Sequence, residues 1–445
     1  MVQQGNLPRL LEDIVGREHI TESAAAQSEY GVDGLRPALV VAPGDRQQIS
    51  EVIRAAGQAN AGIISWGGGT MMGRGQIPAA YDIALMLGRV REIVDFDVAN
   101  LTVTVQAGLP LSQLQEHLAQ ERQFLPLDPF WPERASAGGT VAANASGPSR
   151  LRYGAARDLV LGMRVVVATG EMIHVGGKTV KNVAGYDLSK MFIGSYGSLG
   201  IITEVTFRLL PQPQHKRALR IVFAALGDAQ KFAMRILDSE LLPTTLSILN
   251  GPGSNSITGA DPETCNLVMG IEGSTETVER QVKQMAVLAG SAGASSIQAL
   301  DGPELDALLS AVRDFAPTAW QAHPEGMALT ANLPISRTAE VVSEWKQSAA
   351  DLGLTVSCVI AAGVGTVQGQ TTAAATSQLV ALYNSLVAAA ERVGGHCALD
   401  RAAPQVKEQV QVWSTPREEW RLAQALKQKF DPQGLFNRGR FVGGI

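Results

Sequence analysis

The stretch "ISWGGGTMMGRG" (64–75) restricts the fold more than any other part of the sequence. Three consecutive glycines follow a short apolar run that predicts a buried strand, and Gly73 and Gly75 come soon after. Ordering glycine costs more backbone entropy than ordering other residues, so a glycine run indicates a chain that something approaches closely. Successive backbone N–H groups without neighbouring Cβ atoms can converge on an anion. We therefore predict a strand followed by a phosphate-binding loop, with Thr70 as a hydroxyl donor.

Two common nucleotide-binding motifs do not fit this loop. The dinucleotide fingerprint G-x-G-x-x-G fails because its third glycine, counted from Gly67, falls on Met72. The "GGKT" at 176–179 has the tail of a P-loop, but the first glycine of that motif would have to stand where Met172 is. For the loop taken by itself, a glycine-rich turn without a ligand stays open, since glycine runs are common in turns.

Strand and helix patterns alternate along the chain, which predicts an α+β fold of at least two domains. Residues 1–35 form a predicted N-terminal helical segment, and 36–213 a first α/β domain that ends near "PQPQHK". Two strand–helix–strand series then predict a second, ferredoxin-like α/β domain over 214–400, with an antiparallel sheet backed by helices. The remaining segment, 401–445, contains a helix that we expect to begin at Thr415 and Pro416.

Charge and cysteine content narrow the function classes. The 37 Lys and Arg against 42 Asp and Glu give a net charge of −5, so we expect no nucleic-acid partner. Cys265, Cys358 and Cys397 stand far apart, which argues against a disulfide framework or a metal cluster held by this chain alone. Neither a secretory signal nor a long apolar run is evident. We expect a cytoplasmic protein, peripheral at the inner face of a membrane at most.

Three further motifs accompany the glycine loop. They are "LTVTVQAGLPLSQL" (101–114), "LPLDPFWPERASAGGTVAANASG" (125–147) and "GSYGSLGIIT" (194–203). In this order the motifs resemble the FAD-binding domain of the vanillyl-alcohol-oxidase, or PCMH-type, family, and "DPQGLFNRGR" (431–440) extends the resemblance thinly to the C-terminus. Within the family the chain is most similar to the FAD-binding, E-type subunits of bacterial glycolate oxidases.

The resemblance implies a PCMH-type FAD-binding domain of two α/β subdomains over 36–213, a cap over 214–400, and a C-terminal segment that returns to the FAD domain. The glycine loop would hold the FAD pyrophosphate. Some family members attach FAD through a histidine in this loop, but Ser65 to Gly75 contain no His or Cys, so we expect noncovalent FAD. Lys181, Asn182 and Tyr186 are candidates near the flavin ring. The implied FAD-contacting residues are Trp66, Gly67, Gly68, Gly69, Thr70, Asp128, Pro129, Ala137, Gly138, Gly139, Asn144, Gly147, Tyr153, Gly197, Ser198, Gly200 and Ile202.

The substrate site of related 2-hydroxy-acid dehydrogenases has no counterpart in this sequence. Those enzymes, including the D-type subunits of glycolate oxidases, carry a cap segment similar to HAGDGNLH and a later Glu-His pair. The corresponding "IAAGVGTVQGQ" (360–370) keeps Gly363 and Gly365 but has no His, Asp or Asn. In "GGHCALDRA" (394–402), His396 has no Glu beside it. We therefore expect no metal site and name no catalytic residue.

Three functions are open at this point. The first is an FAD subunit of a multisubunit glycolate (2-hydroxy-acid) dehydrogenase, in electron transfer or assembly beside a catalytic flavoprotein and an iron–sulfur subunit. The second is a self-sufficient FAD-dependent oxidoreductase acting on a small hydroxy acid or alcohol. The third is a structural subunit with a vestigial flavin fold. Candidate substrate residues for the second are Arg313, Trp320, His323, His396 and Arg401.

Overall fold

The computed structural model describes residues 6–177, 187–254, 257 and 263–445. The flavin-ring candidates Lys181, Asn182 and Tyr186 lie outside the described residues.

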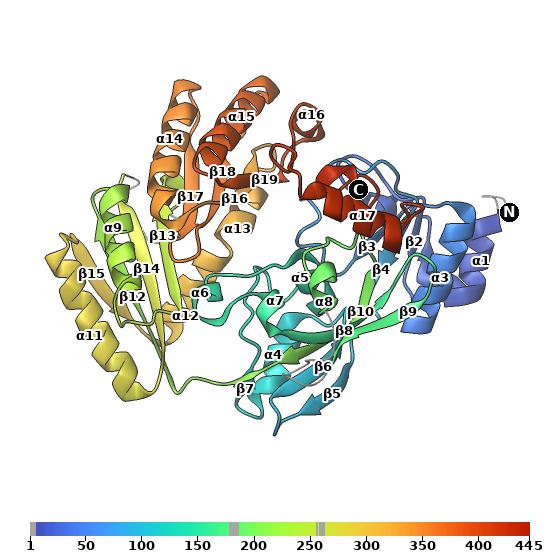
Figure 1. The fold of residues 1–445 in the computed structure, drawn as a ribbon, viewed down its shortest axis with the longest axis horizontal. Coiled ribbons are helices and arrows are strands. Elements are labelled where there is room, and N and C mark those ends of the chain that lie inside the picture. Colours follow the sequence, from blue (N-terminus) through green and yellow to red (C-terminus); the bar gives the residue numbers. More distant parts are fainter. Residues whose placement is uncertain (1–5, 178–186, 255–256, 258–262) are drawn as a thin grey trace. The chain divides into compact units, whose positions relative to one another are not determined.

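The chain divides into two compact units (Figure 1). Residues 147–154 and 401–414 group with the second unit, not with the FAD domain and the C-terminal segment in which the sequence analysis places them. Unit 1 comprises Met1–Ser146, Ala155–Gln212 and Thr415–Ile445, and unit 2 comprises Gly147–Gly154 and Pro213–Ser414.

Unit 1 is built on two main sheets. In its described residues, a four-stranded sheet has the order β1-β2-β4-β3, with β2, β4 and β3 parallel, and a five-stranded antiparallel sheet has the order β5-β6-β10-β8-β9. This pair of sheets confirms the predicted PCMH-type architecture. The strands are β1 (Ile20–Thr21), β2 (Leu39–Val41), β3 (Ile63–Trp66), β4 (Ile83–Met86), β5 (Ile93–Asp97), β6 (Thr102–Gln106), β7 (Gln123–Phe124), β8 (Val160–Val166), β9 (Met172–Gly176), β10 (Ile201–Arg208) and β11 (Leu210–Pro211).

The helices of unit 1 follow the local signals of the sequence. Asp45 caps α3 by accepting a hydrogen bond from the Gln48 backbone N–H at 2.8 Å, and α4 buries Leu111, Leu114 and Leu118. The C-terminal helix α17 begins at Trp420, so the start predicted at Thr415 is wrong. The helices are α1 (Leu7–Val15), α2 (Ala24–Glu29), α3 (Arg46–Ala59), α4 (Leu111–Ala119), α5 (Ala137–Ala143), α7 (Ala156–Leu159), α8 (Ser189–Phe192) and α17 (Trp420–Phe430).

Unit 2 contains an antiparallel sheet whose strands do not follow one another in sequence order. Its eight strands, counted among the described residues, have the order β15-β12-β14-β13-β17-β18-β16-β19. Each half repeats the β-α-β-β-α-β arrangement of ferredoxin-like folds, and the halves join where β13 pairs with β17. The strands are β12 (His215–Phe223), β13 (Thr245–Asn250), β14 (Cys265–Gly273), β15 (Ser296–Leu300), β16 (Ala328–Asn332), β17 (Val356–Ala361), β18 (Thr366–Thr371) and β19 (His396–Arg401).

Helices cover both faces of this sheet. Apolar residues of α9, α11, α14 and α15 pack on one face, whereas α12 and the start of α13 pack on the other, against strand residues such as Ala218 and Val268. The ferredoxin-like prediction is thereby confirmed. The helices of unit 2 are α6 (Arg150–Tyr153), α9 (Leu226–Leu237), α11 (Thr275–Ser291), α12 (Gly302–Arg313), α13 (Phe315–Ala322), α14 (Thr338–Asp351), α15 (Thr376–Arg392) and α16 (Pro404–Lys407).

Candidate cofactor site

The glycine loop leaves the end of β3 at Trp66, whose side chain is anchored in unit 1. The indole N–H of Trp66 donates a hydrogen bond to the hydroxyl of Tyr81 at 2.8 Å, and that hydroxyl donates to the carbonyl oxygen of Tyr30 at 2.6 Å. The rings of Tyr30 and Trp66 also meet edge to face, with centroids 5.2 Å apart. The strand end therefore holds the first residue of the loop in one place.

The loop presents an uninterrupted row of backbone donors. None of the N–H groups of residues 67–72 donates a hydrogen bond to any described residue. The carbonyl groups are in use by contrast, since Trp66 O accepts from Leu87 N at 2.9 Å and Met71 O accepts from Arg74 N at 3.1 Å. Backbone donors in folded proteins are nearly always paired, so six successive free N–H groups are well suited to bind an anion such as a pyrophosphate.

Packing within the protein also requires glycine at the start of the loop. A Cβ atom at Gly68 would overlap the carbonyl group of Arg134, and one at Gly67 would overlap the hydroxyl of Ser136. The guanidinium of Arg134 in turn donates to Gly68 O at 3.4 Å. The loop thus lies directly against residues 134–136, and this contact alone requires glycine at position 68.

The start of α5 lies beside the same loop, but its backbone donors are occupied. Ser136 caps the helix by accepting from Gly139 N at 3.2 Å, Ala137 N donates to Leu109 O at 2.9 Å, and Gly138 N donates to Ala107 O at 2.8 Å. The candidates Asp128, half-buried, and Pro129, buried, precede this helix in the chain.

Asn144 ends α5 with a left-handed backbone, at φ +47°. Its side-chain oxygen is buried and has no hydrogen-bond partner among the described residues. Burying a polar atom without a partner costs free energy, so this amide is placed to bind a group that the chain itself does not supply.

The turn at 194–198 connects α5 to the glycine loop. Tyr196 N donates to Ala142 O at 2.8 Å, and a Cβ at Gly197 (φ +67°) would lie 3.0 Å from Ser65 Oγ. Ser198 is fully buried and its hydroxyl donates to Ser195 O at 2.7 Å. The loop, α5 and the turn therefore form one contiguous group of candidate residues.

Of the remaining candidates, two pack against other residues of unit 1 and two belong to unit 2. A Cβ added at Gly200 would lie only 2.6 Å from Val165 Cγ1, so Gly200 is packed against β8, and Ile202 is buried in β10. Gly147 and Tyr153 belong to unit 2, where the Tyr153 hydroxyl donates to Glu272 Oε2 at 2.7 Å. Burial and this contact with Glu272 raise the pKa of Tyr153.

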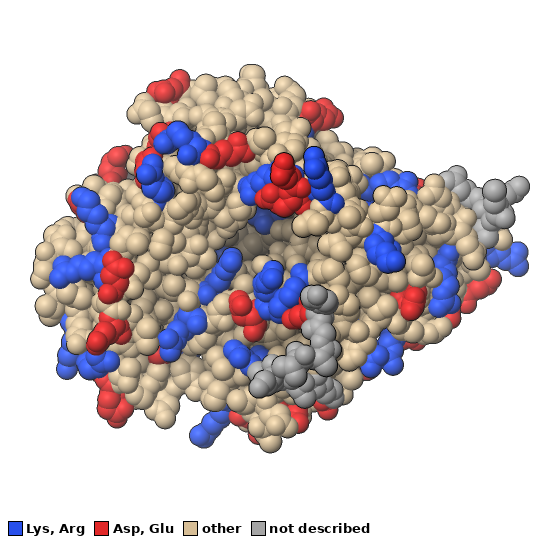
Figure 2. All heavy atoms as spheres, viewed as in Figure 1, with Lys and Arg blue, Asp and Glu red and all other residues tan. Residues whose placement is uncertain are grey.

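The substrate candidates all belong to unit 2. The guanidinium of Arg313 pairs with the carboxylate of Asp314 at 2.6 Å, and His396 Nε2 lies 3.3 Å from Asn332 Nδ2. His323 and Arg401 are exposed, whereas Trp320 is buried. Within the described ranges, no group of three or more His, Cys, Asp or Glu could hold a metal ion. Acidic and basic side chains are interspersed over the face shown in Figure 2.

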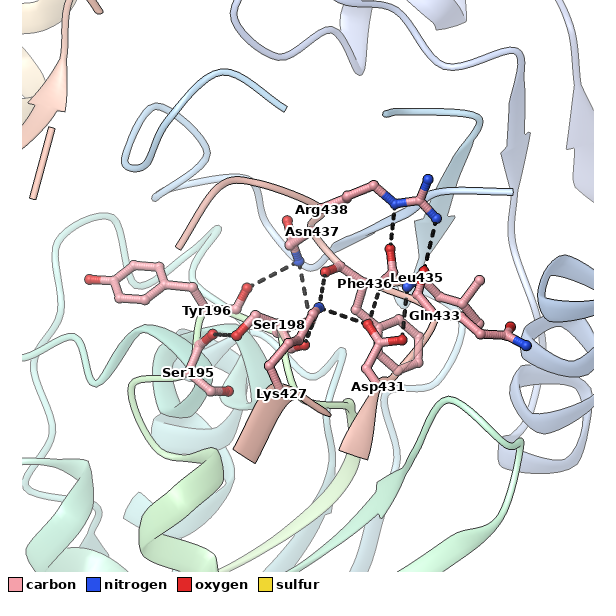
Figure 3. A network of polar contacts seen from close by, with 12 residues as sticks. Ser195, Tyr196, Ser198, Lys427, Asp431, Gln433, Leu435, Phe436, Asn437 and Arg438 are labelled. Carbon is pink, nitrogen blue, oxygen red and sulfur yellow. Dashed lines mark hydrogen bonds and ion pairs between the residues drawn. The ribbon is translucent and has the colours of Figure 1, made fainter. Parts of the chain in front are cut away.

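The C-terminal segment contributes residues to this region that the sequence analysis missed. The backbones of Ile63 and Leu435 pair at 2.7 Å, so residues 435–437 run beside β3. The ammonium of Lys427 donates to Asp431 Oδ2 at 2.7 Å and to Ser198 O and Phe436 O at 2.8 Å each (Figure 3). Burial lowers the pKa of Lys427, although the Asp431 carboxylate opposes this shift. The signals in the sequence were the motif "DPQGLFNRGR", which begins at Asp431, and a Lys four residues before that Asp.

The described residues fit a bound FAD. The free N–H row of residues 67–72 suits the pyrophosphate, and the unpartnered amide oxygen of Asn144 lies on the neighbouring element. No helix among the described residues is both long and apolar enough to span a bilayer.

Comparison with solved structures supports the fold. The crystal structure of p-cresol methylhydroxylase with substrate bound superposes with a TM-score of 0.77 at 16% sequence identity, covering 99% of this chain and 97% of that chain.

Two curated relatives carry glycolate oxidase names. The chain is 28% identical over 447 residues to glycolate oxidase subunit GlcD of Bacillus subtilis (strain 168), covering 97% of this chain and 95% of that protein. It is 42% identical over 131 residues to glycolate oxidase subunit GlcE of Escherichia coli (strain K12), covering 29% and 37%. The similarity to the D-type subunit runs along the whole chain, so the relatives do not single out the E-type subunit that the sequence motifs favoured.

Family models match most of the chain. The model for the FAD binding domain matches residues 37–176, and the model for the C-terminal domain of FAD linked oxidases matches residues 212–441. The second match covers more than half of the chain, and the two together contain both the glycine loop and the C-terminal segment. The chain therefore belongs to the FAD-linked oxidases, a family of oxidoreductases whose cofactor is FAD.

Proposed function

We propose that this chain is the FAD-binding subunit of a multisubunit glycolate (2-hydroxy-acid) dehydrogenase, in electron transfer or assembly beside a catalytic flavoprotein and an iron–sulfur subunit. The observation that carries the proposal is the row of free N–H groups at 67–72, which supports a working cofactor site. The local identity of 42% to a GlcE subunit supports this type of subunit. The cap sequence at 360–370, without His, Asp or Asn, supports a substrate site on another chain.

In this proposal the glycine loop holds the FAD pyrophosphate through Gly67, Gly68, Gly69 and Thr70. FAD supplies the hydride and electron chemistry when it is bound, and the protein binds and orients it. Noncovalent binding is supported by the absence of His and Cys from residues 65–75. Asn144 would contribute a hydrogen bond next to the loop, since its amide oxygen has no partner within the described chain. The complex would work in the cytoplasm or at the inner face of a membrane.

A self-sufficient FAD-dependent oxidoreductase is the second candidate. The similarity to glycolate oxidase subunit GlcD along 97% of the chain favours it, because that similarity is not confined to the FAD-binding domain. The cation for a hydroxy-acid carboxylate would then come from Arg401, which is exposed, since Arg313 is already paired with Asp314. A vestigial flavin fold receives no support from the free donors of the loop.

Purification of the tagged chain from its native host tests the proposal. We expect a yellow protein that co-purifies with a second flavoprotein and an iron–sulfur protein, and whose flavin is released entirely by acid precipitation. The separated chain should not oxidise glycolate or D-lactate with a dye acceptor. Turnover by the separated chain at the rate of the complex would refute the subunit role and establish the second candidate. A colourless chain that takes up no FAD would refute both.

A further inference from the structure

We propose that Arg440 is a positioning residue of the FAD site, which fixes the second half of the glycine loop in the form that binds the FAD pyrophosphate. The proposal depends on the pyrophosphate location proposed above, and it is independent of the subunit role.

The side chain of Arg440 connects two points of the loop to the C-terminal segment. Its Nη2 donates to Met72 O at 2.6 Å and to Arg74 O at 3.0 Å, and its Nη1 donates to Asn437 Oδ1 at 3.0 Å. The residue is buried, with 7% of its surface exposed. Hydrogen bonds from a charged donor are stronger than neutral ones, and burial shields them from competition by water.

Asn437 extends this connection to the turn at 194–198. Its amide nitrogen donates to Tyr196 O at 3.0 Å and to Gly197 O at 3.3 Å (Figure 3). The backbone of Asn437 has φ +45°, a left-handed conformation that Asn tolerates better than most residues. Arg440 and Asn437 therefore link the two segments of unit 1 that carry candidate FAD contacts, the loop and the turn.

The C-terminal segment is itself firmly held, so it can serve as a fixed support. The Asp431 carboxylate accepts from Leu435 N and Phe436 N at 2.8 Å each, and its partner Lys427 also donates to Ser198 O. The backbone of Arg440 adds a further tie, because its carbonyl accepts from Gln76 N at 3.0 Å.

The loop needs such a support because of its composition. Residues 67–75 contain five glycines, and a glycine-rich loop loses much backbone entropy when a ligand orders it. Interactions that order the loop before FAD binds remove that cost from the binding step. We therefore expect the hydrogen bonds of Arg440 to increase the affinity for FAD, and their removal to weaken it.

Two variants of Arg440 separate its geometry from its charge. Arg440→Met removes both, whereas Arg440→Lys keeps a buried positive charge that cannot reproduce the planar fork of the guanidinium. We expect both to raise the Kd for FAD about 10- to 100-fold, which is about the contribution of one hydrogen bond from a charged donor. The Kd for ADP should rise by a similar factor, because ADP carries the pyrophosphate without the flavin ring.

Arg438 offers a matched control in the same segment. Its guanidinium donates to Gly434 O at 2.6 Å, Gln433 O at 3.2 Å and Asn60 Oδ1 at 3.1 Å, all outside the loop and the turn. We expect Arg438→Met to leave the Kd for FAD and the Kd for ADP within about twofold of wild type. The reason is that Arg438 shares no described hydrogen-bond partner with the loop or the turn, so its loss should not couple to them.

The experiment titrates FAD-free protein with FAD, followed by quenching of flavin fluorescence, and repeats the titration in competition with ADP. The melting midpoint of each FAD-free protein reports a purely structural effect. The proposal is overturned if the Arg440 variants bind FAD and ADP with wild-type Kd values, whether or not their melting midpoints are lower. It is also overturned if the Kd for FAD rises while the Kd for ADP does not, or if Arg438→Met raises both Kd values as much as Arg440→Met does. If Arg440→Met does not fold, Arg440→Lys decides by the same criteria. No partner protein is present, so the outcome leaves the subunit role untouched.

Discussion

Replacing Gly68 with alanine should release FAD, although alanine adds a single methyl group. In the structure, a Cβ at this position overlaps the carbonyl group of Arg134, and neither backbone can yield without moving the loop or residues 134–136. Gly68→Asp should cause the same loss, because the Cβ points toward Arg134 and the first carbon of any side chain is sufficient for the overlap.

The size of the effect follows from the overlap. Forcing an extra methyl group into a closely packed site costs about 1–3 kcal/mol, and more when the neighbour is backbone. If that cost falls on the loop form that binds FAD, the Kd rises about 5- to 150-fold, at 1.4 kcal/mol for each factor of ten. The change should also lower the melting temperature of the FAD-free protein, because the contact with residues 134–136 exists without FAD.

Gly88→Ala is the matched control for this experiment. A Cβ at Gly88 meets no atom within 4 Å, so the same chemical change has room there. The assay is the ratio of flavin to protein absorbance after gel filtration, together with the Kd from titration of FAD-free protein. Equal flavin content and equal Kd in Gly68→Ala and Gly88→Ala would falsify the packing argument for the loop.

Three further predictions concern other residues. Lys427→Met should lower the free energy of unfolding by about 3 kcal/mol, since it leaves the buried carboxylate of Asp431 without its cation. Urea unfolding measures this change. If the double variant Lys427→Met, Asp431→Asn loses the sum of the two single effects, the two side chains do not act as a pair. Burial raises the pKa of Cys358 to about 12 and also raises the pKa values of Cys265 and Cys397. At a given pH these thiols therefore form less thiolate than an ordinary thiol, whose pKa is about 8.5. Ellman's reagent at pH 8 should label none of the three cysteines before denaturation. Rapid labelling of the folded protein is the contrary result. His396→Ala should leave the flavin content unchanged, because the ring lies on β19 beside Asn332, and a loss of flavin would contradict this.

Local signals predicted much of the secondary structure because their physical causes lie within a few residues. Examples are the helix-capping side chain of Asp45, the leucines spaced three and four apart in α4, and the Thr169-Gly170 turn between β8 and β9, and each of these elements is present in the structure. The start of α17 was misplaced, since the Thr415-Pro416 signal falls where the chain passes from unit 2 to unit 1. A capping pattern describes a local preference, and tertiary packing overrides it at such a crossing.

The cofactor region was predictable only in part. A glycine run shows that a Cβ is excluded, but it does not show whether a ligand or the protein excludes it, and at Gly68 the protein does. The contact between Arg440 and Met72 joins residues 368 positions apart, so no local pattern could pair them. The same holds for Lys427 and Ser198, which meet only because the C-terminal segment runs beside β3.

Anaerobic reduction of the purified, flavin-loaded chain tests the central claim most directly. Glycolate is added in the absence of oxygen, and the flavin absorbance near 450 nm is followed with and without the catalytic flavoprotein partner. The account predicts a yellow protein whose absorbance falls only when the partner is present. Bleaching of the isolated chain by glycolate alone, at the rate seen with the partner, would contradict the proposed subunit role.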